Sequence, residues 1–345
     1  MPRPRPHSRI PLNTFAVPFG LAGSAEAWSS AAPVLHLPAF LPQVSWVVAA
    51  VAWLAMLTAH VVRGLRVRGH DRLVDQLRHP SQGPLAALVP ATAMLLGVDL
   101  SRVWPTGGTV LVLLGVAVAA GFAGWLLATW FEGRLALESV HGGYLLPTVA
   151  AALVGSVATH EVGVTWLSWA CFGVGVFFWG VMTGLLLLRL AFRPELPGPL
   201  VPTMAILVAP PSVATVSLFA LTDDAVTLPV QAVAGLGVLL LLVQLALLPR
   251  YVRLSFSLGF WSFVFPAAAV ATAAVEWLRI LDVPGGWIPT VVVLGLLTAL
   301  VAVVGARSIG LAVHHLLGQA EDELQAADDE DAEPGPVTGS TRQVA

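Results

Sequence analysis

Uncharged apolar segments alternate along the chain with short segments that hold most of its charges. Each apolar segment is about 20 residues long, which is the length an α-helix needs to cross the hydrocarbon layer of a bilayer. Glu26 is the one Asp, Glu, Lys or Arg residue inside any of them. The pattern predicts ten membrane-spanning helices, over residues 10–32, 43–62, 79–98, 103–131, 139–160, 162–188, 196–222, 225–249, 254–275 and 283–306.

The composition agrees with a membrane protein, because 57% of the residues are hydrophobic and only 11% are charged. Soluble domains contain about 25% charged residues. We therefore expect an all-α integral membrane protein that has membrane lipid around it and no nucleic-acid partner. Its predicted parts are an N-terminal cytoplasmic tail over residues 1–9, a transmembrane domain over 10–317, and an acidic, disordered cytoplasmic tail over 318–345.

The basic residues, which number 17 and are all arginine, predict the orientation in the membrane. If the N-terminus is cytoplasmic, 15 arginines fall on the cytoplasmic side and only Arg102 and Arg279 fall on the other. Cytoplasmic loops of membrane proteins carry such an excess of basic residues. We therefore expect a multi-pass protein of the cell's inner (plasma) membrane, with both termini in the cytoplasm.

A proline recurs inside every second predicted span, at Pro18, Pro90, Pro147, Pro202 and Pro266, and small residues follow it each time. The spans between them are rich in leucine and valine and have no proline near the middle. A proline bends a helix and frees backbone groups, which protein or water must then satisfy. The pattern therefore predicts five helical hairpins. In each hairpin the proline-bearing helix lies inside, around a lumen, and the leucine- and valine-rich helix faces lipid.

The predicted span 254–275 places large aromatic rings before Pro266 and a run of small residues after it. A bulky ring beside a bend, followed by a helix surface of small alanine side chains, indicates a constriction next to an open pore. The same pattern is typical of a kinked membrane helix that packs closely on its neighbours. Both interpretations stay open on this segment alone.

Three short motifs follow one another along the spans: IPLNTFAVPFGLAG at residues 10–23, APPS at 209–212 and FWSFVFP at 260–266. With the ten spans and the five prolines, they make residues 10–315 resemble the tellurite-resistance/dicarboxylate transporter family, which includes a bacterial tellurite-resistance channel homologue and the plant slow anion channel. The resemblance implies hairpins in a quasi-fivefold ring around a central pore, homotrimers and anion conduction. It also implies that a phenylalanine of the ninth span plugs the pore, at Phe265, with Phe263 as the alternative register.

Phe265 is accordingly the predicted gate, a ring that blocks the lumen and moves aside to open it; ordinary aromatic packing is the alternative. The five prolines are the predicted pore-lining kinks. Each would begin a half-helix whose N-terminal end carries partial positive charge, which suits an anion. A weak, distributed field of this kind also lets the ion leave again.

The ionisable side chains predict neither a metal site nor a cofactor. Glu26 would repel anions if it faced the lumen, so we expect a structural hydrogen bond or an interfacial position for it. Glu276 and Arg279 are three residues apart, as in a helix-surface ion pair. The histidines lack the spacing of metal ligands. His141 is expected in a loop, with pH sensing as the alternative, and Cys171 in apolar packing.

The sequence thus predicts a passive anion channel or facilitative transporter, for small inorganic anions or dicarboxylates. A proton-coupled C4-dicarboxylate carrier and a tellurite or sulfite exporter are alternatives within the same family. An intramembrane lipid-modifying enzyme is the alternative of another class. We expect no enzyme, because the chain has no phosphate-binding Gly-x₄-Gly-Lys-Ser/Thr loop, no Gly-x-Ser-x-Gly motif and no paired carboxylates within a span.

Overall fold

The computed structural model describes residues 10–66, 73–133 and 135–332, and their side chains as far as residue 314. These residues form helices joined by turns and short loops, without a strand among them. The chain divides into two compact units, Met1–Val301 and Ala302–Ala345, which are described separately below. The prediction of an all-α protein is confirmed for the described residues.

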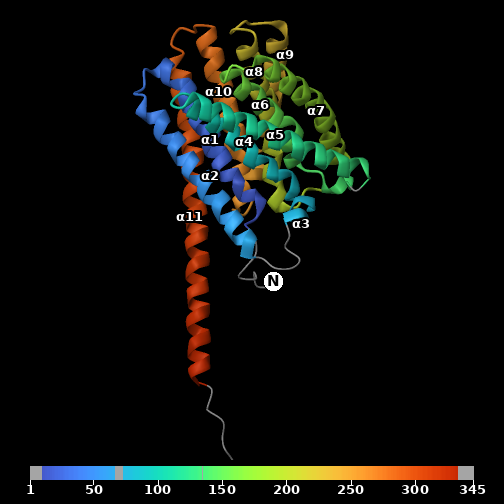
Figure 1. The fold of residues 1–345 in the computed structure, drawn as a ribbon, viewed down its shortest axis with the longest axis vertical. Helices are drawn as coiled ribbons and strands as arrows, with labels where there is room; N and C mark the ends of the chain where they lie inside the picture. The colour runs from blue at the N-terminus through green and yellow to red at the C-terminus, as the bar shows by residue number, and fades with distance from the viewer. Residues whose placement is uncertain (1–9, 67–72, 134, 333–345) are drawn as a thin grey trace, which may run out of the picture. The chain divides into compact units, whose positions relative to one another are not determined.

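Ten α-helices of more than ten residues lie in the described chain, and Figure 1 shows them coloured in chain order. They are α1 (Ala16–Leu35), α2 (Phe40–Arg66), α4 (Leu88–Ser101), α5 (Pro105–Phe131), α6 (Ala151–Glu161), α7 (Thr165–Phe192), α8 (Ala209–Leu221), α9 (Leu228–Tyr251), α10 (Val264–Ile280) and α11 (Trp287–Ala332). A short helix, α3 (Leu73–Arg78), precedes α4.

Nine helical stretches of the described residues are long and apolar enough to cross a membrane. They coincide, within about five residues at each end, with the second to tenth predicted spans, except that the last one continues eight residues further, to His314. The first predicted span forms α1, which has 20 residues but is not among the nine. Ser24, Glu26 and Ser29 make α1 more polar than the other spans. A total of ten crossings therefore stays a prediction.

Two kinds of helix alternate along the first unit. In the apolar stretches that contain α4, α6, α8 and α10, between 56% and 89% of the residues are buried inside the protein. In α2, α5, α7 and α9 the share is between 0% and 22%. These four helices expose valine and leucine side chains along their length. Because apolar surface of this extent is stable only in an apolar surrounding, α2, α5, α7 and α9 are the helices suited to contact lipid.

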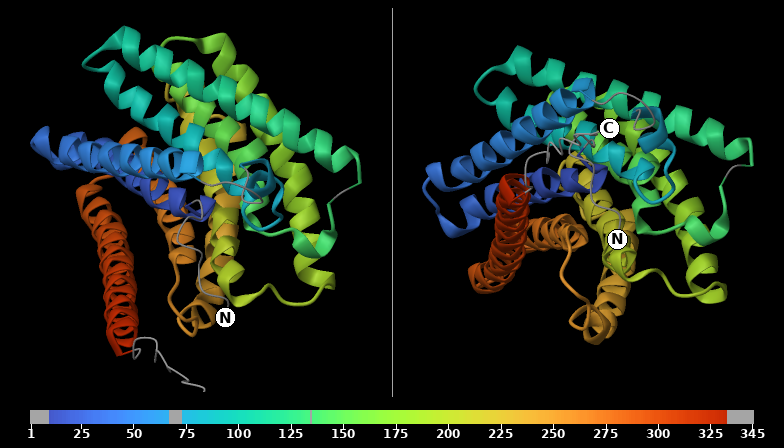
Figure 2. Two further views of the ribbon diagram at one scale, coloured as in Figure 1. Left: turned by 60° about the horizontal axis from the view of Figure 1, so that its bottom comes forward. Right: turned by 90° about the horizontal axis from the view of Figure 1, so that it is seen from below.

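Helix α1, in which nine of the 20 residues are buried, belongs with these enclosed helices, and the five pack on one another in a closed cycle. Helix α1 contacts α4 and α10, α6 contacts α4 and α8, and α8 contacts α10. Each exposed helix packs on the enclosed helix before it in the chain: α2 on α1, α5 on α4, α7 on α6 and α9 on α8. Two of these hairpins are easily followed in Figure 2, α1 with α2 in blue and α4 with α5 in teal.

The enclosed α-helices do not begin abruptly but continue from a differently wound helical segment. The 3₁₀ segments are η1 (Leu12–Phe15), η2 (Gly83–Ala87), η6 (Gly198–Val208) and η7 (Leu258–Phe263), before α1, α4, α8 and α10 respectively. A π-helical turn, η5 (Leu146–Ala150), precedes α6. The change of winding thus occurs near the places where the sequence predicted kinks.

Proline explains why the α-helices start where they do. It has no N–H to donate and its fixed φ suits the first turn of an α-helix. Pro18, Pro90 and Pro266 are the third residues of α1, α4 and α10. In the seventh span this position belongs to Pro211, the third residue of α8, whereas Pro202 lies within the preceding 3₁₀ segment. The repeat therefore holds for α1, α4, α8 and α10, with Pro211 rather than Pro202 as the matching residue, whereas Pro147 lies in η5 before α6.

Buried hydroxyls also join the helices. The Oγ atoms of Ser156 on α6 and Ser217 on α8 lie 2.5 Å apart. Ser168 on α7 donates to the Ser156 carbonyl at 2.6 Å. All three serines are fully buried. Interhelical hydroxyl bonds of this kind stabilise membrane helices by about 0.6–2 kcal/mol each.

The second unit consists, as far as it is described, of the C-terminal part of α11, which continues to Ala332. The sequence predicted a disordered tail over residues 318–345, so the structure differs from the prediction as far as Ala332. Alanine, leucine, glutamine and glutamate are strong helix formers, and they are frequent in this stretch. The remainder of the predicted tail, and the N-terminal tail over residues 1–9, lie outside the described residues.

Candidate functional site

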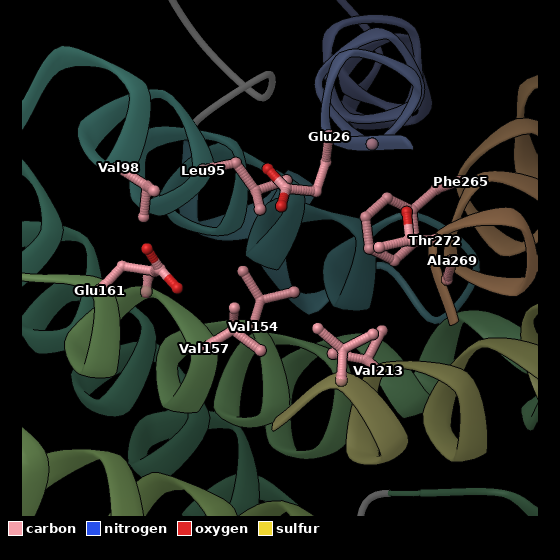
Figure 3. Close-up of a pocket in the computed structure, with 13 residues that line it drawn as sticks. Glu26, Leu95, Val98, Val154, Val157, Glu161, Val213, Phe265, Ala269 and Thr272 are labelled. Carbon is pink, nitrogen blue, oxygen red and sulfur yellow. The ribbon is translucent and has the colours of Figure 1, made fainter. Parts of the chain in front are cut away.

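A cavity lies where the five enclosed helices face one another. Residues of α1, α4, α6, α8 and α10 all line it, as Figure 3 shows. We call it the central cavity, and its lining is apolar apart from two carboxylates and one hydroxyl. The lining residues are Gly23, Glu26, Leu95, Val98, Val154, Val157, Ala158, Glu161, Val213, Val216, Phe265, Ala269 and Thr272. The volume of the cavity is only about 50 Å³, so the cavity is narrow.

Phe265 enters this cavity from the second residue of α10. Its ring stacks on Phe19 of α1, with ring centroids 3.8 Å apart and an angle of 19° between the planes. Gly23, one turn further along α1, leaves room for the ring: a Cβ atom there would lie 2.7 Å from Cδ2 of Phe265. The contact with α1 therefore fixes where the ring sits in the cavity.

The structure distinguishes the two registers that the sequence left open for the aromatic plug. Phe263, the last residue of η7, packs against Tyr251 and Phe260, with centroid distances of 4.9 and 5.5 Å. It does not line the central cavity, whereas Phe265 does. Two residues correspond to about 200° of rotation around a helix, so the two rings point in different directions.

The central cavity continues into a wider space, which we call the vestibule. The two spaces share Glu26, Val157, Glu161 and Val216. The vestibule has a volume of about 750 Å³, compared with about 50 Å³ for the central cavity. The vestibule lies at the C-terminal ends of α1, α6, α8 and α10. Together the two spaces form a funnel that narrows from the vestibule toward Phe265.

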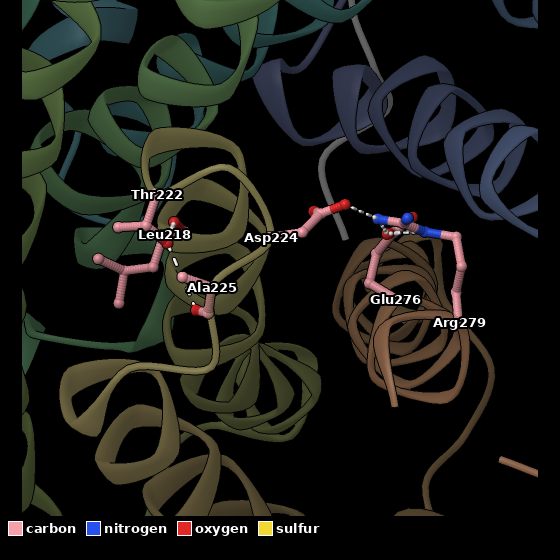
Figure 4. Close-up of polar contacts among 6 residues, drawn as sticks. All are labelled: Leu218, Thr222, Asp224, Ala225, Glu276 and Arg279. Carbon is pink, nitrogen blue, oxygen red and sulfur yellow. Dashed lines mark hydrogen bonds and ion pairs between the residues drawn. The ribbon is translucent and has the colours of Figure 1, made fainter. Parts of the chain in front are cut away.

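One arginine holds two of the acidic residues of the vestibule. Arg279 lies 2.7 Å from the Glu276 carboxylate and 2.9 Å from the Asp224 carboxylate, as Figure 4 shows. The predicted pair of Glu276 and Arg279 is therefore present, and Asp224 from the loop after α8 extends it. Among the residues that line either space, Arg279 is the one arginine in the described chain.

Glu26 and Glu161 differ from these paired acids. Their side chains point into the central cavity from α1 and α6. Neither forms a hydrogen bond or ion pair with another residue of the described chain. Of the two expectations for Glu26, the described residues offer no partner for a structural hydrogen bond, and the interfacial position stays a prediction. Glu26 lies three residues after Gly23, and this spacing, which places both on one helix face, was the signal that sequence reasoning missed.

The remaining predicted residues lie outside the central cavity. None of the five predicted prolines lines it; residues one to three turns further along the same spans do. Pro147 instead lines a separate apolar cavity between α5, α6 and α7, together with Cys171. His141 is fully buried at the start of η4 (Gly142–Leu145), where its Nδ1 accepts from the Gly143 N–H at 3.1 Å. The described residues contain no cluster suited to a metal ion.

These features define a multi-pass, all-α membrane protein in which enclosed helices surround a narrow cavity that an aromatic ring enters. A comparison with known families matches residues 9–309 to SLAC1, the voltage-dependent anion channel family. The chain belongs to this family, which is the one that the sequence motifs resemble, and that prediction is confirmed. A comparison with curated proteins finds no match.

Proposed function

We propose that this protein is a passive anion channel or facilitative anion transporter, with a pathway that runs through the central cavity and the vestibule. The observation that supports it most is the cavity itself, because one residue or more from each of the five enclosed helices lines it. A cavity bounded by every enclosed helix is the arrangement that a pore along a quasi-fivefold axis requires. Membership of an anion channel family supplies the charge of the transported species.

Phe265 is the proposed gate. It is 7% exposed and lies at the narrow end of the funnel. With the ring in place the central cavity has a volume of only about 50 Å³, which gives little room for an anion with its shell of water. Rotation of the Phe265 side chain away from Phe19 would widen the passage without any change in the helices.

The field along the pathway favours an anion at the Phe265 end. A helix carries partial positive charge at its N-terminus and partial negative charge at its C-terminus. Helices α1, α6, α8 and α10 have their C-terminal ends at the vestibule, and Phe265 belongs to the first turn of α10. The described lining of the central cavity contains two carboxylates and no arginine, so an anion there would be held weakly and released readily.

The wider organisation follows from the same proposal. The arginine distribution supports a location in the cell's inner membrane with both termini in the cytoplasm, which places the vestibule on the outer side. The exposed apolar faces of α2, α5, α7 and α9 would be covered by lipid and by neighbouring copies in a homotrimer. Prolines lie near the start of each enclosed helix and shape the pathway indirectly, through the change of helical winding.

Flux measurements on the pure protein in liposomes test the proposal. Removal of the ring in Phe265→Ala should raise chloride and nitrate flux down their gradients by about tenfold or more, with no need for a proton gradient. Phe263→Ala is the matched control, because it removes an equal ring that packs on Tyr251 outside the cavity. Equal flux from both variants and the unchanged protein would refute the gate, and absence of anion flux from all of them would refute the function.

A further inference from the structure

Glu26 and Glu161 occupy a special place in the funnel, because they line both the central cavity and the vestibule. Figure 3 shows their carboxylates facing the open space from α1 and α6, with the Phe265 ring across from them on α10. An ion that moved through the two spaces between the vestibule and Phe265 would cross this junction. The two carboxylates thus lie on the proposed pathway.

The distance from Glu26 to the proposed gate is short. Gly23 contacts the Phe265 ring, and Glu26 follows one helical turn later on the same face of α1. One turn corresponds to about 5 Å along the helix axis. Glu26 is enclosed by protein, and the part of its side chain that remains accessible faces the cavity. An ion that passes the ring thus comes within contact range of this carboxylate.

The charges of the surrounding groups compensate the two carboxylates only in part. Arg102, the residue after α4, attracts Glu26 electrostatically, but it also pairs with Asp99 of α4 at 3.9 Å. From α10, Glu276 pairs with Arg279, which also holds Asp224 of the loop after α8. His160 neighbours Glu161 on α6, and Asp223 neighbours Asp224 in the loop; neither brings a fixed positive charge. Helix α8 contributes only Val213, Val216, Phe219 and Ala220 to the two spaces.

We propose that Glu26 and Glu161 form a carboxylate filter that makes the pathway selective for monovalent anions over divalent anions. The inference rests on the proposed function and names its substrate class. Coulomb repulsion scales with the product of the charges, so a dianion is repelled twice as strongly as a monoanion at the same place. Chloride and nitrate would therefore pass at neutral pH, whereas sulfate and fully ionised dicarboxylates would be rejected.

The filter also makes selectivity depend on pH in a defined direction. Protonation of Glu26 removes one negative charge from the junction and weakens the rejection of dianions. Asp223 and His160 lie in the wider vestibule, where a larger volume of water screens their effect. Mild acid should therefore raise sulfate flux relative to nitrate flux. Nitrate and sulfate keep their own charges in this range, so the change reports on the protein.

The test measures nitrate and sulfate flux from liposomes that hold the full-length protein, with Phe265→Ala as the common background. Glu26→Gln and Glu161→Gln keep the size of each side chain and remove its charge. Each should raise the ratio of sulfate to nitrate flux on the order of tenfold, and the double variant should lose the pH dependence of this ratio. Glu195→Gln is the control, because this exposed acid pairs with Arg250 away from the funnel and its loss should leave the ratio unchanged.

The outcomes separate this inference from the proposed function. If nitrate crosses in the Phe265→Ala background and the flux ratio is the same with and without Glu26 and Glu161, the filter is refuted and the channel stands. If nitrate does not cross in that background, the channel and the filter fail together. Size-exclusion profiles of the Gln variants show whether each remains folded. If Glu26→Gln does not fold, the flux ratio of a folded Glu161→Gln variant is sufficient to test the filter.

Discussion

The ring of Phe265 on α10 lies almost flat on the ring of Phe19 on α1, with centroids 3.8 Å apart. The two residues belong to the first and ninth predicted spans, so the contact joins elements from opposite ends of the transmembrane domain. It places the proposed gate against α1 rather than free in the cavity. If Phe265 is the gate, opening the pathway would require breaking this stack, and the strength of the stack would set how often the ring moves.

Replacement of Phe19 by leucine should loosen the gate. A stacked aromatic pair contributes about 0.5–1.5 kcal/mol beyond its buried area, so its loss should raise nitrate flux about two- to tenfold in the protein with Phe265 intact. The effect should be smaller than that of removing Phe265 itself. Phe15→Leu is the control, because Phe15 is fully buried but packs on His60 instead. Unchanged flux in Phe19→Leu would show that the stack does not restrain the ring.

A methyl group at Gly23 should disturb the same contact by overpacking. In Gly23→Ala the new Cβ atom would lie 2.7 Å from Phe265 Cδ2, and the ring or the helix must shift. Overpacking of this kind costs about 1–3 kcal/mol, which thermal unfolding in detergent measures. Gly121→Ala on α5 has no atom within 4 Å of the new Cβ and should stabilise the helix by about 0.5–1 kcal/mol. Equal stability of the two variants would contradict the close fit.

Loss of Arg279 should make the vestibule more repulsive to anions. Arg279→Gln leaves the Asp224 and Glu276 carboxylates without their partner. In the Phe265→Ala background we expect nitrate flux to fall about three- to tenfold at low ionic strength and to recover in high salt, because salt screens exposed charges. Arg250→Gln, which breaks an exposed pair with Glu195, is the control. A salt-independent loss of flux would point to misfolding instead of repulsion.

Reactivity of introduced cysteines should map the pathway. Cys171 is the one cysteine of the chain, so Cys171→Ser gives a cysteine-free background. In it, Thr272→Cys lines the central cavity and should react with a small polar thiol reagent. Ala271→Cys, its immediate neighbour, points into a buried cluster with Ala27 and Val275 and should not react. Equal labelling of both positions would mean that water reaches α10 by a route other than the funnel.

The sequence predicted much of this arrangement because membrane spans leave a strong pattern. Long uncharged segments locate α2 and α4 to α11, and the spacing of the prolines separates enclosed from exposed helices. The spans and prolines depend on local composition and on position along one helix, which a single chain displays directly. Phe265 was identified through the family resemblance, which implies a plugging phenylalanine on the ninth span, and the structure puts its ring in the cavity.

Other features depend on packing, which composition does not reveal. The polar residues of α1 look unsuited to a membrane until Glu26 is seen to face an internal cavity. Pro202 was predicted as the kink of the seventh span, and only the start of the α-helix at Ala209 shows that Pro211 holds the matching position. The helical path of α11 to Ala332 was missed because acidic composition was weighted above helix propensity.

A current recording on the Phe265→Ala variant tests the central claim most directly. The pure protein is placed in a planar bilayer with unequal chloride concentrations on the two sides, and the voltage at which the current vanishes is measured. An anion pathway opened by loss of the ring predicts a steady current whose reversal voltage lies at the chloride equilibrium potential. No current, or a reversal voltage at the cation equilibrium potential, would contradict it.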